Sequence, residues 1–303
     1  MHSRPDVLVL GGGGVLGEAW MMGVLAGLED AAGFDLRRCD YFVGTSAGAI
    51  VSAHLAAGRS PRRPGSGRRP REASFEPTER LAQAGTTAAR RAGAWAMAMA
   101  STFAPLALGL AAPGGAFMRA LLLGRLPRPS QTLDQLRGHI DELGARFDGR
   151  LRVTAVDRGT GRRVVFGSPG APRASVAEAV QASCTVPWLF APVRIGGREY
   201  VDGGVWSPTN ADAAPAGSGS CVLCLNPTAS LAGSADAIGV FRRVSQSAAT
   251  IETLALRRRG AEVEVVRPNP DCAREMGLNL MDRRPAARVL AAGYRQGQEL
   301  GAQ

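Results

Sequence analysis

A serine lies between two glycines in the run from Gly44 to Gly48, GTSAG, which fits the pattern G-x-S-x-G. An apolar run from Tyr41 to Val43 precedes it and predicts a strand, and an alanine-rich pattern from Ala49 to Ala57 predicts a helix after it. On a tight turn between a strand and a helix, a serine hydroxyl is exposed above the sheet and can attack an acyl group. The pattern also fits an ordinary turn with a serine helix cap, so alone it indicates only that Ser46 is a candidate nucleophile.

A glycine-rich loop follows the first predicted strand, Asp6 to Leu10, and precedes a predicted helix, Glu18 to Ala32. Consecutive glycine amides at the start of a helix form a site for an anion. Beside a serine nucleophile, such amides would stabilise the oxyanion of an acyl tetrahedral intermediate. The candidate donors are the amides of Gly12, Gly13 and Gly14.

The same loop has a second interpretation, because residues Gly12 to Gly17 also fit the dinucleotide-binding pattern G-x-G-x-x-G. That fingerprint requires an acid after the second strand, about 20 residues past the glycines, to bind the ribose. Here Asp40 precedes the second strand, and the strand ends instead in the Ser46 turn. Dinucleotide binding therefore stays as an alternative function.

The histidines are poorly placed to activate the serine. The chain has only His2, His54 and His139. The order serine, acid, histidine leaves Asp134 and His139 as the one candidate pair, and both fall on a predicted polar helix instead of at strand ends. His54 lies about two helical turns beyond Ser46, away from the hydroxyl. We therefore predict that the histidines are structural or at the surface.

An aspartate remains as the candidate base. Asp202 ends a predicted strand and is followed by Gly203 and Gly204, which allow backbone to approach closely. At the C-terminal edge of a parallel sheet, its side chain would lie beside Ser46. A desolvated carboxylate within hydrogen-bonding distance can accept the proton of a serine hydroxyl.

The composition is that of a globular protein: 303 residues, of which 45% are hydrophobic and 20% charged. The net charge is +10, and every basic residue is arginine. Such an excess suits an anionic lipid surface. No basic patch with interleaved aromatic residues indicates nucleic acid. No secretory signal precedes the first strand, so we expect a cytoplasmic protein, peripheral at the inner membrane face.

The cysteines and acidic residues predict neither a metal nor a cofactor. Five cysteines without a secretory signal do not suggest a disulfide framework. Cys221 and Cys224 form a lone C-x-x-C within an apolar run, which predicts a buried strand and not a zinc site. No acidic loop has the ligand density that calcium requires.

Strands that alternate with helices predict an α/β fold with three layers, a mostly parallel central sheet and helices on both faces. The remaining predicted strands are Leu151–Asp157, Arg163–Phe166, Val193–Ile195, Arg198–Val201, Cys221–Leu225 and Ala261–Val266. Of these, Val193–Ile195 and Arg198–Val201 are expected to form a tight hairpin around Gly196 and Gly197 that leads to Asp202. The remaining predicted helices are Leu133–Leu143, Ser175–Ala182, Asp236–Arg259 and Ala286–Leu300.

A segment from about 59 to 129 interrupts this alternation. Arg59 to Arg71 is rich in arginine, proline and glycine and predicts a solvated basic loop that could contact an anionic bilayer. Ala92 to Met118 has no charged residue. We expect one or two helices there that form a lid or a wall for an acyl chain, with a core helix or a membrane span as alternatives.

Taken as a set, these motifs resemble those of the patatin-like phospholipases. In that family G-G-G-x-[R/K]-G supplies the oxyanion hole, G-x-S-x-G the nucleophile and D-G-[G/A] the aspartate of a Ser-Asp dyad. The matching glycines here, besides the three candidate donors, are Gly17, Gly44, Gly48, Gly203 and Gly204. The resemblance covers about residues 6–215, which implies a catalytic domain there and a C-terminal extension over 216–303 packed on it. One position departs from the pattern, because Leu16 replaces the usual basic residue.

The resemblance implies a serine lipid acyl hydrolase that needs no cofactor. It would cleave fatty-acyl esters of phospholipids or lysophospholipids through an acyl-Ser46 intermediate, with Asp202 as base. A catalytically silent, membrane-associated scaffold is a further alternative, motivated by Leu16 and the basic loop.

Overall fold

The computed structural model describes residues 3–65, 115–126, 128–187, 189–230, 249–277 and 279–302. Within them, one eight-stranded sheet has the order β5-β6-β3-β2-β1-β7-β8, with β4 paired to β3. The strands are β1 (Val7–Leu10), β2 (Tyr41–Gly44), β3 (Leu151–Asp157), β4 (Arg163–Phe166), β5 (Val193–Ile195), β6 (Arg198–Asp202), β7 (Cys221–Leu225) and β8 (Glu262–Val266).

The centre of the sheet is parallel and one end is antiparallel. Strands β3, β2, β1, β7 and β8 pair in parallel with their neighbours. Strands β4, β5 and β6 pair antiparallel with theirs. The central strands β1 and β3 are buried along their whole length, as parallel strands between helical layers require. The predicted α/β fold with a mostly parallel sheet is confirmed.

The named helices of the described chain are α1 (Gly14–Ala32), α2 (Ala47–Ala56), α5 (Gly115–Arg125), α6 (Asp134–Leu143), α7 (Val176–Cys184), α9 (Pro270–Met276) and α10 (Ala286–Gly301). Residues 249–258 are also helical. Helix α1 begins four residues earlier than predicted, because the Gly17 amide closes the first turn on the Gly13 carbonyl inside the glycine loop. Helix α9 was not predicted, although Asn269 caps it and Pro270 opens it.

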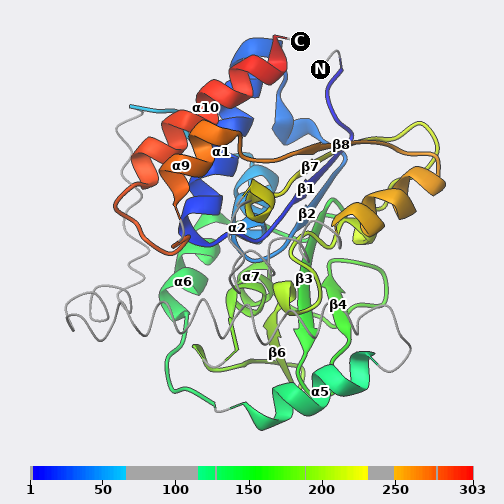
Figure 1. Ribbon diagram of the computed structural model, residues 1–303. Coiled ribbons are helices and arrows are strands. Elements are labelled where there is room, and N and C mark those ends of the chain that lie inside the picture. The colour runs from blue at the N-terminus through cyan, green and yellow to red at the C-terminus, as the bar shows by residue number, and fades with distance from the viewer. Residues whose placement is uncertain are drawn as a thin grey trace.

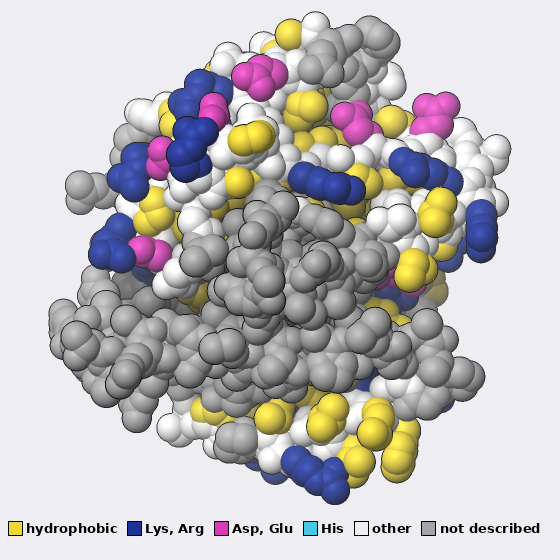
Figure 2. Space-filling view, viewed as in Figure 1, with side chains coloured by type: hydrophobic (Ala, Val, Ile, Leu, Met, Phe, Trp, Pro, Cys, Tyr) yellow, Lys and Arg dark blue, Asp and Glu magenta, His cyan; other side chains and the backbone are white. Residues whose placement is uncertain are grey.

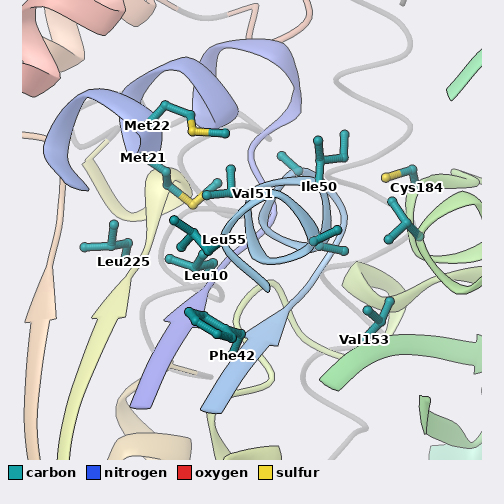
Figure 3. Close-up of a cluster of buried hydrophobic side chains, with 14 of the residues drawn as sticks. Leu10, Met21, Met22, Phe42, Ile50, Val51, Leu55, Val153, Cys184 and Leu225 are labelled. Atoms are coloured by element: carbon teal, nitrogen blue, oxygen red, sulfur yellow. The ribbon is translucent and has the colours of Figure 1, made fainter. Parts of the chain in front are cut away.

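Hydrophobic side chains alternate between the two faces of the sheet. Leu8 and Leu10 of β1 belong to a core formed with α1, α2, α6 and α7, whereas Val7 and Val9 join a second core on the other face. Leu256, in the helical stretch 249–258, covers that second core. Figure 3 shows side chains of β1, β2 and β3 pointing toward α1 and α2. The result is the predicted sheet with helices on both faces.

Helices α1, α9 and α10 lie together on one side of the molecule, and α5 lies at the opposite end beyond β6 (Figure 1). The Trp20 indole nitrogen of α1 donates a hydrogen bond of 2.9 Å to Gln296 of α10, so the predicted C-terminal helix packs on the first one. In the described parts of the chain, no helix is both long and apolar enough to cross a bilayer.

Three predicted segments fall partly outside the described residues. They are the end of the basic loop beyond residue 65, the apolar stretch up to residue 114 and the first half of the helix expected from Asp236.

Candidate active site

Strands β2 and β6 meet end to end on one edge of β3. Strand β2 pairs with β3 as far as Val153, and β6 pairs with it from Ala155 onward. Both of these residues also pair with β4, which therefore occupies the opposite edge of β3. The C-terminal residues of the two strands, Gly44 and Asp202, thus converge on either side of Thr154. This register brings the serine turn and the aspartate together.

The strand that carries Asp202 runs in a different direction from the one expected, because the sequence suggested a parallel strand. Strand β6 is the second half of the hairpin with β5, which turns at Gly196 and Gly197. The hairpin reverses the chain, so β6 runs antiparallel to β3 and approaches the serine turn from the opposite direction. Asp202 still ends its strand beside Ser46, as predicted.

Ser46 occupies a strained backbone conformation at the start of α2, with φ 52° and ψ −119°. A positive φ is costly for a residue with a side chain and persists only where its surroundings hold it in place. The Ser46 amide donates a hydrogen bond of 2.8 Å to the hydroxyl of Ser183, at the end of α7. A Cβ on Gly48 would lie 1.9 Å from the Leu10 carbonyl oxygen, so the second motif glycine is required for α2 to approach β1.

Asp202 is buried, and its environment makes it a weak acid. Burial raises the pKa of its carboxyl from 3.8 to about 7. Two hydrogen bonds act against burial and lower this pKa. One is donated by the Gly204 amide, 2.7 Å from Oδ1, and the other is with the Ser46 side chain. The carboxyl therefore titrates near neutral pH, where a general base is most effective.

The end of α7 supports both members of the pair. Ser183 accepts the Ser46 amide, and the Thr185 carbonyl accepts the Asp202 amide at 2.9 Å. Between them lies Cys184, which is buried. Burial is the largest cause that raises the pKa of its thiol, and the charge of Asp202 is the next. A hydrogen bond with Ser46 acts in the opposite direction and lowers this pKa. A protonated thiol is a poor nucleophile, so Cys184 does not compete with the serine.

The glycine loop lies against Ser46, since a Cβ on Gly12 would come within 3.5 Å of the Ser46 Cβ. The Gly12 amide donates to the Pro208 carbonyl at 2.8 Å and is thereby used within the protein. Within the described part of the chain, the amides of Gly13 and Gly14 have no hydrogen-bond partner. Gly13 is the N-cap of α1 and Gly14 is its first residue, so both amides lie where the helix dipole favours a negative charge.

The family profile described as patatin-like phospholipase matches residues 8–215, more than half of the chain. The chain belongs to the patatin-like phospholipase family. It is therefore an ester hydrolase, and membership supports lipid acyl hydrolase activity in general. No curated protein sequence matches it. Among solved structures, VipD from Legionella pneumophila is similar at 16% identity and a TM-score of 0.44, over 98% of this chain and 67% of that one.

This member of the family has an apolar core residue where the motif usually has a basic one. Leu16 is fully buried, and its amide donates to the Leu280 carbonyl at 3.0 Å. The segment before α10 thus covers the first turn of α1 and excludes water from this position. A charged side chain with the same orientation would be buried without a partner, which is costly.

The histidines of this patatin-like protein lie apart from the serine, as predicted, except that His2 falls outside the described residues. The rings of His54 and His139 lie 5.4 Å apart, and His54 Nδ1 contacts the Ile50 carbonyl oxygen at 2.9 Å. Burial lowers the pKa of His54, which favours its neutral form. Neither ring has a described contact with Ser46 or Asp202.

Asn210 joins the two loops of the site and was not found from the sequence. Its side-chain nitrogen lies 3.2 Å from the Gly203 carbonyl oxygen, 3.1 Å from Thr45 Oγ1 and 2.5 Å from the Ser207 carbonyl oxygen. It links the residue before Ser46 to the residue after Asp202. The sequence signal that could have identified it is the turn from Ser207 to Asn210. Asn210 has a positive φ of 50°, which asparagine tolerates better than most residues.

Asn210→Gly is expected to lower kcat for a soluble ester by up to about 100-fold, because small displacements of reacting groups have effects of that size. Glycine accepts the backbone conformation and removes only the amide, and the KM should change little. Steady-state kinetics with a thermal melt tests this. Unchanged kcat with a lowered Tm would show that Asn210 stabilises the fold without positioning the pair.

Proposed function

We propose that the protein hydrolyses fatty-acyl esters of phospholipids or lysophospholipids with Ser46 as nucleophile and Asp202 as general base. The observation that supports this most is the convergence of β2 and β6 on one edge of β3, next to a carboxyl whose pKa is raised to about 7. A histidine is not needed, because a desolvated carboxylate in contact with the hydroxyl can take its proton.

In the first half of the reaction, ionised Asp202 accepts the hydroxyl proton while Ser46 Oγ forms a bond to the ester carbonyl carbon. The negative charge moves to the carbonyl oxygen, which the amides of Gly13 and Gly14 stabilise. The bond to the leaving alcohol then breaks, and Asp202 returns the proton to that oxygen. The products of this half are an acyl-Ser46 ester and the free alcohol.

In the second half, Asp202 accepts a proton from water as the water oxygen attacks the acyl-serine. The tetrahedral intermediate collapses, the bond to Ser46 Oγ breaks, and Asp202 protonates the serine. The fatty acid leaves, and the enzyme returns to its first state. Gly12 has a supporting part in this scheme, because its amide holds the loop to Pro208.

We further propose that the enzyme acts from the cytoplasm as a peripheral protein at the inner membrane face, where its net charge of +10 would favour anionic lipids. Arg62 and Arg63, at the start of the predicted basic loop, already pair with Glu18 and with Glu29 and Asp30. These ion pairs reduce, without removing, the contribution of the two arginines to the attraction.

Covalent labelling by a fluorophosphonate probe tests the proposed nucleophile. We expect stoichiometric labelling of the wild-type protein, with the modified peptide containing Ser46, and no labelling of Ser46→Ala. Ser52→Ala is a matched control, because this buried serine on the same helix has a hydroxyl without a hydrogen-bond partner among the described residues. Absence of labelling in the wild type, with lipid binding but no ester hydrolysis, would instead support a silent scaffold.

A further inference from the structure

Helix α5 has the reverse of the usual burial pattern. Its apolar residues Phe117 and Met118 are 73% and 55% exposed, and Leu121 and Leu122 are exposed beside them, whereas Arg119 is fully buried. Figure 2 shows hydrophobic side chains gathered at the end of the molecule where α5 lies in Figure 1. Contiguous apolar side chains on a surface mark an interaction site more often than isolated ones do.

The inner side of α5 is held firmly to the strand that bears Asp202. The Arg119 guanidinium lies 4.3 Å from the centre of the Trp206 ring and donates to the Gly161 carbonyl. Leu123 packs with Val201 of β6 and with Val205, just beyond Asp202. Because these contacts fix the helix, its exposed leucines cannot turn inward to bury themselves.

Exposed arginines lie near the C-terminal end of α5 and on the neighbouring β5–β6 hairpin. Arg158, just after β3, donates to the Leu126 carbonyl at 3.2 Å and pairs with Glu199 of β6 at 3.1 Å, and so connects the end of α5 to the β5–β6 hairpin. The exposed arginines are Arg125, Arg128, Arg194 and Arg198. The carboxylates that pair with three of them, Glu199 and Asp157, are largely buried beneath. Together with Arg158, the arginines of this group outnumber its two carboxylates, so its net charge is positive.

We propose that this apolar face of α5 (Phe117, Met118, Leu121 and Leu122), with the neighbouring arginines, docks the enzyme onto an anionic lipid bilayer. The proposal rests on the proposed function and names the surface that it uses. The apolar side chains would enter the boundary between headgroups and acyl chains, and the arginines would bind lipid phosphates. A symmetric contact with a second copy of the chain is disfavoured, because it would bring the same arginines together.

The test is co-sedimentation with two kinds of vesicle, one of phosphatidylcholine alone and one of phosphatidylcholine with about 30% phosphatidylglycerol. We expect wild-type protein to bind the anionic vesicles and Phe117→Glu/Leu121→Glu to bind them at least about 10-fold more weakly. The matched control is Ile251→Glu/Leu254→Glu, which adds the same charge at two exposed apolar residues elsewhere. It should bind nearly as well as the wild type.

Arg125→Gln/Arg128→Gln leaves the apolar residues in place and provides a second, gentler variant. It should weaken binding to anionic vesicles only and reduce the salt dependence of that binding. Hydrolysis of a soluble p-nitrophenyl ester should be unchanged in all variants, which separates docking from catalysis. Full binding by both α5 variants, equal loss in the control, or a wild-type dimer that the α5 substitutions dissociate would overturn the proposal.

Discussion

Ser46→Ala is expected to lower kcat/KM for a short p-nitrophenyl ester by at least about 10³-fold, to the residual level of an enzyme without its nucleophile. The neighbouring Cys184 thiol cannot replace the hydroxyl as nucleophile, because its pKa is raised and it stays protonated. The strained turn and the glycine loop would remain intact. Initial rates at saturating and limiting ester concentrations provide the measurement.

The control is again Ser52→Ala, six residues further along α2, which should retain the wild-type rate. A thermal melt of each variant shows whether the fold is preserved. Retention of full esterase activity by Ser46→Ala would reject this serine as the nucleophile. Loss of activity in Ser52→Ala as well would indicate that damage to α2, and not loss of chemistry, explains the result.

Asp202→Asn is expected to lower kcat/KM by about 10³-fold, because removal of a general base that acts with a nucleophile has effects of this order. For the wild type, the base must be ionised. The rate should fall about tenfold per pH unit below the Asp202 pKa of about 7 and become level above it. A pH–rate profile of kcat/KM measures this, and a profile with its break near pH 4 would contradict the buried carboxyl as the base.

The same substitution should stabilise the protein in a pH-dependent way. Because the folded pKa of Asp202 lies above the ordinary value of 3.8, the folded state binds more protons between pH 4 and pH 7. Stability therefore falls as the pH rises through this window, by up to roughly 4 kcal/mol at neutral pH and above. Asparagine avoids this cost, and its amide oxygen can still accept the Gly204 hydrogen bond.

Denaturant melts of the wild type and Asp202→Asn at pH 4.5 and pH 8 would measure the difference. We expect the variant to be more stable than the wild type at the higher pH, with a smaller gain at the lower. Catalytic residues often lower the stability of the fold, because activity needs a group in an unfavourable environment. An equal or reversed effect at pH 8 would mean that Asp202 is not held as a costly buried charge.

Much of the site could be predicted from the sequence because its features are local. A serine between glycines at a strand-to-helix junction specifies its own strained turn, and the φ of 52° at Ser46 confirms it. Strand β3 has the predicted bounds because apolar and polar residues alternate along it. The hairpin that delivers Asp202 follows from two adjacent glycines, Gly196 and Gly197, which both adopt positive φ.

Only the tertiary structure decided how distant segments share hydrogen bonds and burial. The chain pattern suggested that Asp202 would end a parallel strand, but pairing with β3 placed it on an antiparallel strand that meets β2 end to end. The Gly12 amide is satisfied by Pro208, which lies 196 residues further along the chain. Helix-forming residues of α5 do not reveal which side is buried, since Trp206 and Gly161 determine that Arg119 faces inward.

The serine turn, the glycine loop and the aspartate were therefore evident from the residues themselves, because each depends on the conformation of a few neighbours. Their assembly was not, because strand direction, the partner of each amide and the orientation of a helix depend on contacts between residues far apart in the chain. Asn210 illustrates the difference: its positive φ is a local property, but its link between Thr45 and Gly203 exists only in the folded protein.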